Sequence, residues 1–280
     1  METAADKIIR LFLLLLLAPL LAPAQEAVRS NTDGVHQFLT VQLASGTFAV
    51  HDIPPQSADP APAILLLFTD KGGWTLWDDR VGGHLAKLGY YVLGIDTPLY
   101  ASAKGGDYKP DDFAADLERI VEAAPDAFVA KGCPIFLVGR GLGAMAALGG
   151  AAVPPPPPRL AGVIVTDVLP RGRYGYHLRD RVPFLSPGGD GTFSAAEAAA
   201  NLGALPVVHL HPDDGKFDET AWLASVHGPK RQIDYVRGLK NFGVATPPFL
   251  RALDASLAWV LSCRTLTKEL DKNLPMPAAP

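Results

Sequence analysis

The apolar residues of this chain gather in short runs that are separated by longer, more polar stretches. A short run that is mainly apolar, without polar alternation, is typical of a central strand buried on both faces of a parallel sheet. Such runs occupy residues 63–68, 91–95, 134–138, 162–168 and 206–210. A last strand is predicted at 232–236. The pattern therefore predicts a mostly parallel sheet.

The stretches between these strands carry helical periodicity, which is clearest at residues 110–129. There Phe113, Leu117 and Ile120 fall on one face of a helix, and most of the charged residues fall elsewhere. A closing helix is predicted at 247–263. Strands that alternate with helices predict an α/β fold in which helices flank the central sheet on both faces.

Upstream of the first buried run, residues 35–53 alternate between apolar and polar positions on either side of Ser45-Gly46. Strict alternation around a short turn is typical of a β-hairpin with one covered face. The sequence therefore predicts an N-terminal β-hairpin ahead of the α/β domain.

The first 24 residues have the pattern of a signal peptide. Lys7 and Arg10 precede an apolar run at 11–21, and Ala22-Pro23-Ala24 offers small residues for cleavage after Ala24. An uncleaved membrane anchor is the alternative, but the run is about 11 residues long, against about 20 needed to span a bilayer. We therefore expect the chain to be exported, with a periplasmic or secreted mature protein that has no transmembrane span.

The composition of the 280-residue chain narrows the classes of function. Hydrophobic residues make up 48%, which is enough for a large core and excludes a disordered chain. The formal net charge of −4 provides no basic field for nucleic acid. Cys133 and Cys263 are the only cysteines, and the sequence leaves open whether they form a disulfide in an oxidising compartment.

Proline and glycine mark the boundaries between parts of the chain. Residues 25–62 form the hairpin and a proline-rich connector, and 63–265 form the main domain. Five consecutive prolines at 154–158 predict a stiff surface connector. Residues 170–197 lack periodicity, so they are either a lid-like insertion or a loose surface loop. Residues 266–280 are predicted to be a flexible tail.

The loops that follow the predicted strands hold most of the candidate chemistry, because ligands bind at the carboxyl ends of the strands in open α/β sheets. In chain order these loops contain Thr69-Asp70-Lys71-Gly72-Gly73-Trp74, Asp96 to Tyr100, Gly139-Arg140-Gly141-Leu142-Gly143, Asp167, and Asp213-Asp214.

The order and spacing of these loops resemble the α/β-hydrolase fold, and more narrowly the AcvB/VirJ family of exported bacterial virulence proteins. The resemblance covers about residues 63–143. It is carried by Gly72-Gly73-Trp74, by Asp78 or Asp79, by Gly89-Tyr90-Tyr91-Val92-Leu93-Gly94-Ile95-Asp96, and by Tyr100, Pro110, Asp116 and Leu117. It implies a periplasmic hydrolase of aminoacylated phosphatidylglycerol, notably the lysyl form, that needs no cofactor.

The catalytic residues of that fold are not matched. Its nucleophile elbow has the pattern Gly-x-Ser-x-Gly, whereas here Gly141 holds the nucleophile position. Where the fold has its histidine, this chain has Lys240-Asn241. Asp213 or Asp214 retains the acid position and is the only candidate catalytic residue. A triad acid without a base and a nucleophile has nothing to orient.

Two other interpretations of the same loops compete with the hydrolase interpretation. Gly139, Gly141 and Ala144 also fit a dinucleotide fingerprint, with Asp167 as the acid for a ribose, although two strand–helix units precede them. The glycines can equally serve only to pack a helix close to a strand. His209 and His211 share one face of a strand but lack a third metal ligand, so we expect no metal site.

The sequence thus predicts a binding site at the strand ends rather than a serine triad. The predicted binding residues are Thr69, Asp70, Lys71, Gly72, Gly73, Trp74, Tyr100, Arg140, Gly141 and Leu142. Arg140 or Lys71 would bind the anionic group of a lipid or small ester ligand.

Three functions follow from these patterns. The first is a catalytically degenerate protein that binds an anionic lipid or small ligand. The second is an active hydrolase of aminoacyl-phosphatidylglycerol or another ester that uses a non-serine nucleophile. The third is a virulence accessory module that binds a protein partner through residues 170–197 and 154–158.

Overall fold

The structure, a computed structural model, describes residues 37–57, 59–130, 132–177, 180, 187–214, 219–237 and 244–273, with side chains up to residue 265. The predicted signal peptide and Lys240-Asn241 lie outside the described residues. No described helix is both long enough and apolar enough to cross a membrane.

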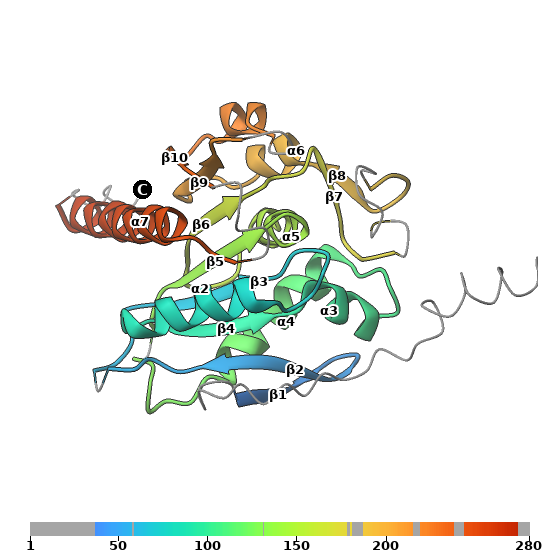
Figure 1. Ribbon diagram of the computed structural model, residues 1–280, viewed down its shortest axis with the longest axis horizontal. Helices are drawn as coiled ribbons and strands as arrows, with labels where there is room; N and C mark the ends of the chain where they lie inside the picture. Colours follow the sequence, from blue (N-terminus) through green and yellow to red (C-terminus); the bar gives the residue numbers. More distant parts are fainter. Residues whose placement is uncertain are drawn as a thin grey trace, which may run out of the picture. The chain divides into compact units, whose positions relative to one another are not determined.

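An eight-stranded sheet forms the centre of the fold (Figure 1). In spatial order it contains β1 (Gln37–Leu43), β2 (Gly46–Ile53), β4 (Tyr91–Ile95), β3 (Ile64–Phe68), β5 (Ile135–Arg140), β6 (Leu160–Thr166), β9 (Val207–Pro212) and β10 (Lys230–Tyr235). The strands β1 and β2 form the predicted antiparallel hairpin, and β2 joins β4 antiparallel. All pairings from β4 to β10 are parallel. The predicted α/β-hydrolase-like architecture is confirmed.

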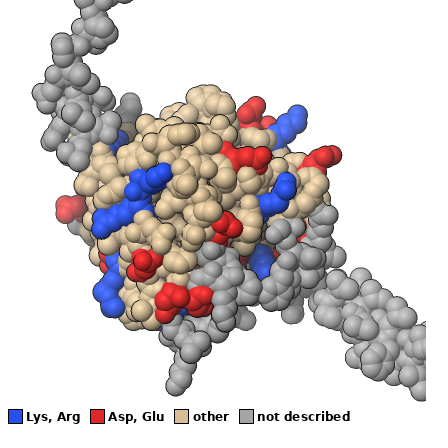
Figure 2. Space-filling model, turned by 90° about the horizontal axis from the view of Figure 1, so that it is seen from above, with Lys and Arg blue, Asp and Glu red and all other residues tan. Residues whose placement is uncertain are grey.

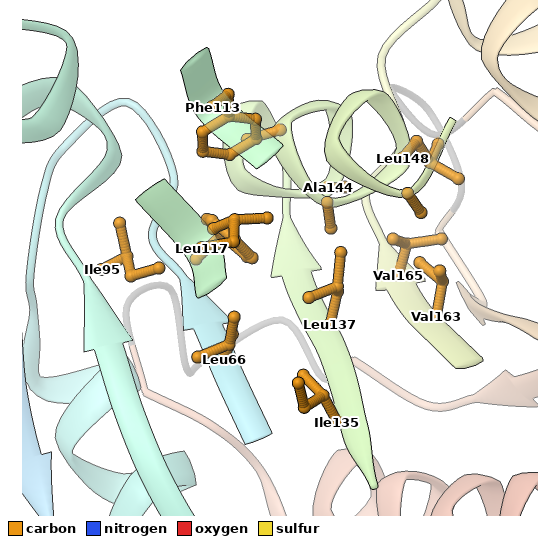
Figure 3. Packing of buried hydrophobic residues seen from close by; sticks show 14 of the residues in the cluster. Leu66, Ile95, Phe113, Leu117, Ile135, Leu137, Ala144, Leu148, Val163 and Val165 are labelled. Carbon is orange, nitrogen blue, oxygen red and sulfur yellow. The ribbon is translucent and has the colours of Figure 1, made fainter. Parts of the chain in front are cut away.

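Helices cover both faces of the sheet because neighbouring residues of each strand point to opposite faces. On one face Leu66 and Leu137 pack with α4 (Pro110–Glu122), α5 (Leu142–Ala151) and α6 (Ala195–Ala200). Figure 3 shows Leu66 and Leu137 of this layer beside Leu117, Ala144 and Leu148 from the helices.

On the opposite face Leu65 and Leu67 pack with α2 (Leu76–Lys87) and α7 (Pro247–Asn273). A further short helix, α3 (Thr97–Ala103), follows β4. On the face in Figure 2, basic and acidic side chains are interspersed, and neither sign forms a continuous field.

Two helix ends differ from the sequence prediction. The helix α4 ends at Glu122 rather than near residue 129, because Pro125 disfavours helical backbone at the residue before it. The helix α7 continues to Asn273, ten residues past its predicted end and into the predicted flexible tail. Residues 264–273 contain neither glycine nor proline, so nothing in them stops the helix.

The insertion at 170–197 contains more structure than its lack of periodicity suggests. Strand β7 (Arg171–Arg173) pairs antiparallel with β8 (Thr192–Ser194). The Tyr176 amide donates to the carbonyl of Gly106, and the Tyr176 hydroxyl donates to the carbonyl of Lys71 at 2.8 Å. The described part of the insertion therefore packs against the loops at the strand ends.

Candidate active site

The turn between β5 and α5 has the backbone shape of a nucleophile elbow. Gly141 has φ 56° and ψ −117°, a left-handed φ that a residue with a side chain adopts only under strain. A Cβ added to Gly139 would lie 2.2 Å from the carbonyl oxygen of Gly143, and one added to Gly143 would lie 2.3 Å from that of Phe68. These two glycines let α5 approach β3 and β5 closely.

The carboxylate of Asp70 fills the space where a nucleophilic side chain would project. A Cβ added to Gly141 would lie 2.2 Å from Asp70 Oδ1. The same oxygen accepts a hydrogen bond from the backbone N–H of Leu142 at 2.9 Å. In this fold the N–H of the residue after the nucleophile contributes to the oxyanion hole. The Asp70 carboxylate therefore fills the space of the nucleophile, and it also accepts the hydrogen bond of one N–H that would otherwise serve the oxyanion hole.

Hydrogen bonds within its own loop and to the loop after β4 hold the segment around Asp70 in place. The carbonyl of Asp70 accepts from the Gly73 N–H at 2.9 Å. The buried hydroxyl of Thr69 accepts from the Thr97 N–H at 3.0 Å. One oxygen of Asp96 accepts from the Trp74 N–H at 2.9 Å. The loop after β3 is thus bound to the loop after β4.

At the predicted acid position, both candidate aspartates contact an arginine. The backbone N–H of Arg237, two residues after β10, donates to Asp213 Oδ1 at 2.9 Å. The Arg237 guanidinium pairs with Asp214 at 3.3 Å and with Asp167. In the fold the loop after the last strand supplies the histidine, so Arg237 lies in the segment from which a base would come. An arginine stays protonated and cannot accept a proton.

Part of the chain matches a known protein family. Residues 63–148 match the family described as "Bacterial virulence protein (VirJ)". The predicted resemblance to VirJ is confirmed over this segment. A search of curated proteins found no match.

Solved structures of hydrolases share the fold. A soluble variant of monoglyceride lipase from Saccharomyces cerevisiae, bound to a substrate analogue, is 17% identical with a TM-score of 0.57. The match covers 85% of this chain and 98% of the lipase. A thermostable carboxyl esterase from Bacillus coagulans is 14% identical with a TM-score of 0.54, covering 82% of this chain and 98% of the esterase. The fold is that of the α/β-hydrolases.

Two aromatic residues predicted to bind ligand, Tyr100 and Trp74, make contacts within the protein. Tyr100 is 1% exposed and its hydroxyl donates to the buried Asp116 at 2.9 Å, so it lies in the core of this VirJ-like segment rather than on the surface of the strand-end loops. Trp74 stacks on His51 with ring centroids 3.7 Å apart, and its Nε1 donates to Asp79 at 2.6 Å. Its ring covers Gly94, where an added Cβ would lie 2.0 Å away.

Arg140 remains the basic residue best placed beside the elbow. Its guanidinium carbon lies 4.5 Å from the centre of the Trp77 ring, within the range of a cation–π interaction. Its Nε is buried without a hydrogen-bond partner, and the rest of the side chain is only partly buried. Lys71 is exposed on the loop after β3.

Asp78, in the first turn of α2, has a carboxyl whose pKa is clearly raised. The residue is 1% exposed, and this burial raises the pKa of its carboxyl to about 6, although Thr75 and Arg140 oppose the shift. Its Oδ2 accepts from the N–H and hydroxyl of Thr75 at 2.9 and 2.6 Å, whereas its Oδ1 has no hydrogen-bond partner. Because burial disfavours the charged form, the ionised Asp78 carboxylate lowers the free energy of unfolding at neutral pH.

We expect Asp78→Asn to stabilise the protein at pH 7 by about 2–3 kcal/mol, relative to the wild type. The raised pKa means that the native state binds more protons than the unfolded state between about pH 4 and 6, so the wild type loses stability as pH rises through that window. The difference in unfolding free energy between the two proteins, measured in urea from pH 3.5 to 7.5, should increase between about pH 4 and 6. Asp111→Asn, at an exposed position, is the control and should show no such increase. A constant difference across the range would contradict the prediction.

The contacts of the strand-end loops favour the packing interpretation of the glycines over the dinucleotide fingerprint. Asp167 pairs with Arg237 rather than standing free for a ribose, and the glycines are explained by helix packing. No group of three metal-ligating side chains is found among the described residues. His209 is fully buried with its ring 5.4 Å from that of Trp222. Cys133 and Cys263 form no disulfide with each other.

The sequence missed two features of the site. It did not single out Arg237, whose only signal is a basic residue shortly after the last predicted strand. It named Asp70 as a binding residue but did not place it against Gly141. The structure also has two hollows away from the predicted site. They lie near the amino ends of β3 and β5 and are lined by Ile64, Ile135 and Arg159 among others.

Proposed function

We propose that this chain is an exported α/β-hydrolase-fold protein that binds a lipid or small anionic ligand without cleaving it, in the periplasm after cleavage near Ala24. The observation that carries the proposal is the Asp70 carboxylate, which takes the Leu142 N–H and fills the space beside Gly141. Glycine at the elbow and Asp70 at the end of β3 form a matched pair, since no side chain at 141 fits beside this carboxylate.

Electrostatics at the elbow support the loss of hydrolysis. Acyl transfer develops negative charge on the substrate oxygen, and the oxyanion hole lowers the barrier by donating N–H groups to it. Here the Leu142 N–H already donates to a carboxylate. A second negative charge at the same place would be repelled by Asp70. The site therefore lacks both a serine nucleophile and the field that a tetrahedral intermediate needs.

The charge of the neighbouring side chains supports an anionic group on the ligand. Arg140 makes no side-chain hydrogen bond within the described residues, so the guanidinium nitrogens other than the buried Nε retain their donors for a phosphate or carboxylate. The exposed Lys71 lies next to Asp70 in the loop after β3. The likeness to VirJ suggests phosphatidylglycerol and its lysyl ester as the first lipids to test.

We expect the purified protein to bind vesicles that contain phosphatidylglycerol or lysyl-phosphatidylglycerol, and to release no free lysine above a buffer control. Arg140→Ala should weaken vesicle binding about ten-fold, because a charge-assisted bidentate contact is lost. The matched control is Arg231→Ala, an exposed arginine on β10 that should leave binding unchanged. Equal binding by both variants would contradict the role of Arg140.

An active hydrolase with a carboxylate nucleophile is the second candidate, because Asp70 lies at the nucleophile position itself. Release of lysine that depends on the protein would favour it over binding alone. Asp70→Asn should then abolish release, and the double variant Asp213→Asn with Asp214→Asn tests whether the acid position participates. Release that survives all of these changes would exclude both the acid position and Asp70.

A further inference from the structure

The two edges of the central sheet differ in how they are protected against pairing with another strand. Edge strands expose unpaired N–H and C=O groups, and soluble proteins discourage pairing there with charged residues, prolines or bulges. The edge strand β10 carries Lys230, Arg231 and Asp234, all exposed. The opposite edge strand β1 has the sequence Gln-Phe-Leu-Thr-Val-Gln-Leu, with no charge and no proline.

The geometry of β1 is also regular enough to accept a partner. All seven of its residues pair with β2 without a register shift, so no bulge interrupts the strand. Phe38 is 59% exposed, and only the ring of His51, 4.7 Å away between centroids, is a described aromatic neighbour. An uncharged, bulge-free edge with an exposed phenylalanine is a template for strand addition.

We propose that β1 is a self-association surface, and that two copies of this chain pair antiparallel through β1 about a twofold axis at Thr40. This register uses the whole strand and places Thr40 opposite Thr40, Leu39 opposite Val41, and Phe38 opposite Gln42. The pairs lie on matching faces, because residues directly opposite each other in an antiparallel ladder share a face.

The side chains of β1 suit this twofold arrangement. Val41 and Leu43 are buried on the face that α4 covers, and Leu39 is partly buried there. Pairing Leu39 with Val41 of the second copy extends that apolar layer across the junction. On the other face Phe38, Thr40 and Gln42 are exposed and uncharged, so no like charges meet. A closed twofold contact also leaves no free β1 edge for further growth.

Such a junction is small, so the dimer should depend on concentration. We expect sedimentation velocity of the purified protein to show a shift from monomer to dimer as its concentration rises. Thr40→Lys should raise the dissociation constant at least about ten-fold, because the twofold axis places two ammonium groups opposite each other. Thr40→Glu should do the same.

Mixing the two variants gives the decisive result. A one-to-one mixture of Thr40→Lys and Thr40→Glu should dimerise again, since lysine then faces glutamate across the axis. Gln232→Lys, which adds a charge to the exposed β10 edge, should leave dimerisation unchanged. Circular dichroism and thermal unfolding establish that each variant is folded.

Three outcomes would overturn the proposal. A wild type that stays monomeric at every concentration leaves β1 without this partner. A dimer that persists with Thr40→Lys places the contact elsewhere on the molecule. Failure of the mixture to dimerise, when each variant alone is folded and monomeric, excludes the register about Thr40.

Discussion

Gly141→Ser, the change that would restore the nucleophile of the elbow, should destabilise the protein by about 2–4 kcal/mol. Its Cβ would collide with the Asp70 carboxylate, from which an ideal Cβ is only 2.2 Å away. The sparsely populated backbone conformation, with φ 56° and ψ −117°, adds about 1–3 kcal/mol for any residue with a side chain. Urea unfolding of the variant and the wild type measures the loss.

The collision and the backbone cost can be separated with a second glycine. Gly203 has φ 60°, close to that of Gly141, but an added Cβ there meets nothing within 4 Å. Gly203→Ser should therefore lose only the cost of a positive φ, without a collision. Asp70→Ala in the Gly141→Ser background should recover about 1–3 kcal/mol, a coupling that Gly203→Ser should not show. Equal losses at 141 and 203 would mean that Asp70 does not fill the elbow.

The contact between Asp70 and the elbow explains why the sequence predicted the glycine turn but not the carboxylate that fills it. The strands of the sheet are short apolar runs, and Gly139, Gly141 and Gly143 stand in one local motif, so both are visible within a few residues. Asp70 and Leu142 are 72 positions apart, and Arg237 and Asp167 are 70 apart. No local pattern measures those distances, because they depend on the order of strands in the sheet.

The contacts of Trp74 and Tyr100 also depend on residues that are distant in sequence. Trp74 and Tyr100 stand in loops at the strand ends, which made them candidates for ligand contacts. Whether such a ring faces a ligand or the protein depends on the small residues and polar partners around it. Trp74 packs because Gly94 leaves room beneath it, and Tyr100 turns inward because Asp116 accepts its hydroxyl. Neither partner adjoins its aromatic residue in sequence.

Asp116→Ala should cost about 3–5 kcal/mol of stability, because it breaks a buried charge network from the centre. The Asp116 carboxylate is 1% exposed and pairs with Lys104, whose side chain is 7% exposed. It also accepts from the Tyr100 hydroxyl and from Arg119, each at 2.9 Å. Burial and the Asp116 charge raise the pKa of Tyr100 far above its usual value, so the hydroxyl remains a donor.

The partners of Asp116 should differ in importance according to their burial. Tyr100→Phe removes one hydrogen bond and should cost about 1–2 kcal/mol. Arg119→Ala should cost less than about 1 kcal/mol, because its side chain is 42% exposed and water replaces the contact. Asp112→Ala, an exposed carboxylate in the same helix, is the matched control.

Lys104 decides whether the cost of Asp116→Ala is a buried, unpaired charge. Without Asp116, the Lys104 ammonium would lie in a nearly buried position with no counterion. Replacing both residues, with Lys104→Met in the Asp116→Ala chain, removes that charge and should restore about 1–3 kcal/mol, measured by urea unfolding at pH 7. If the double variant is no more stable than Asp116→Ala, the loss lies in packing and hydrogen bonds, and the ion pair contributes little to the fold.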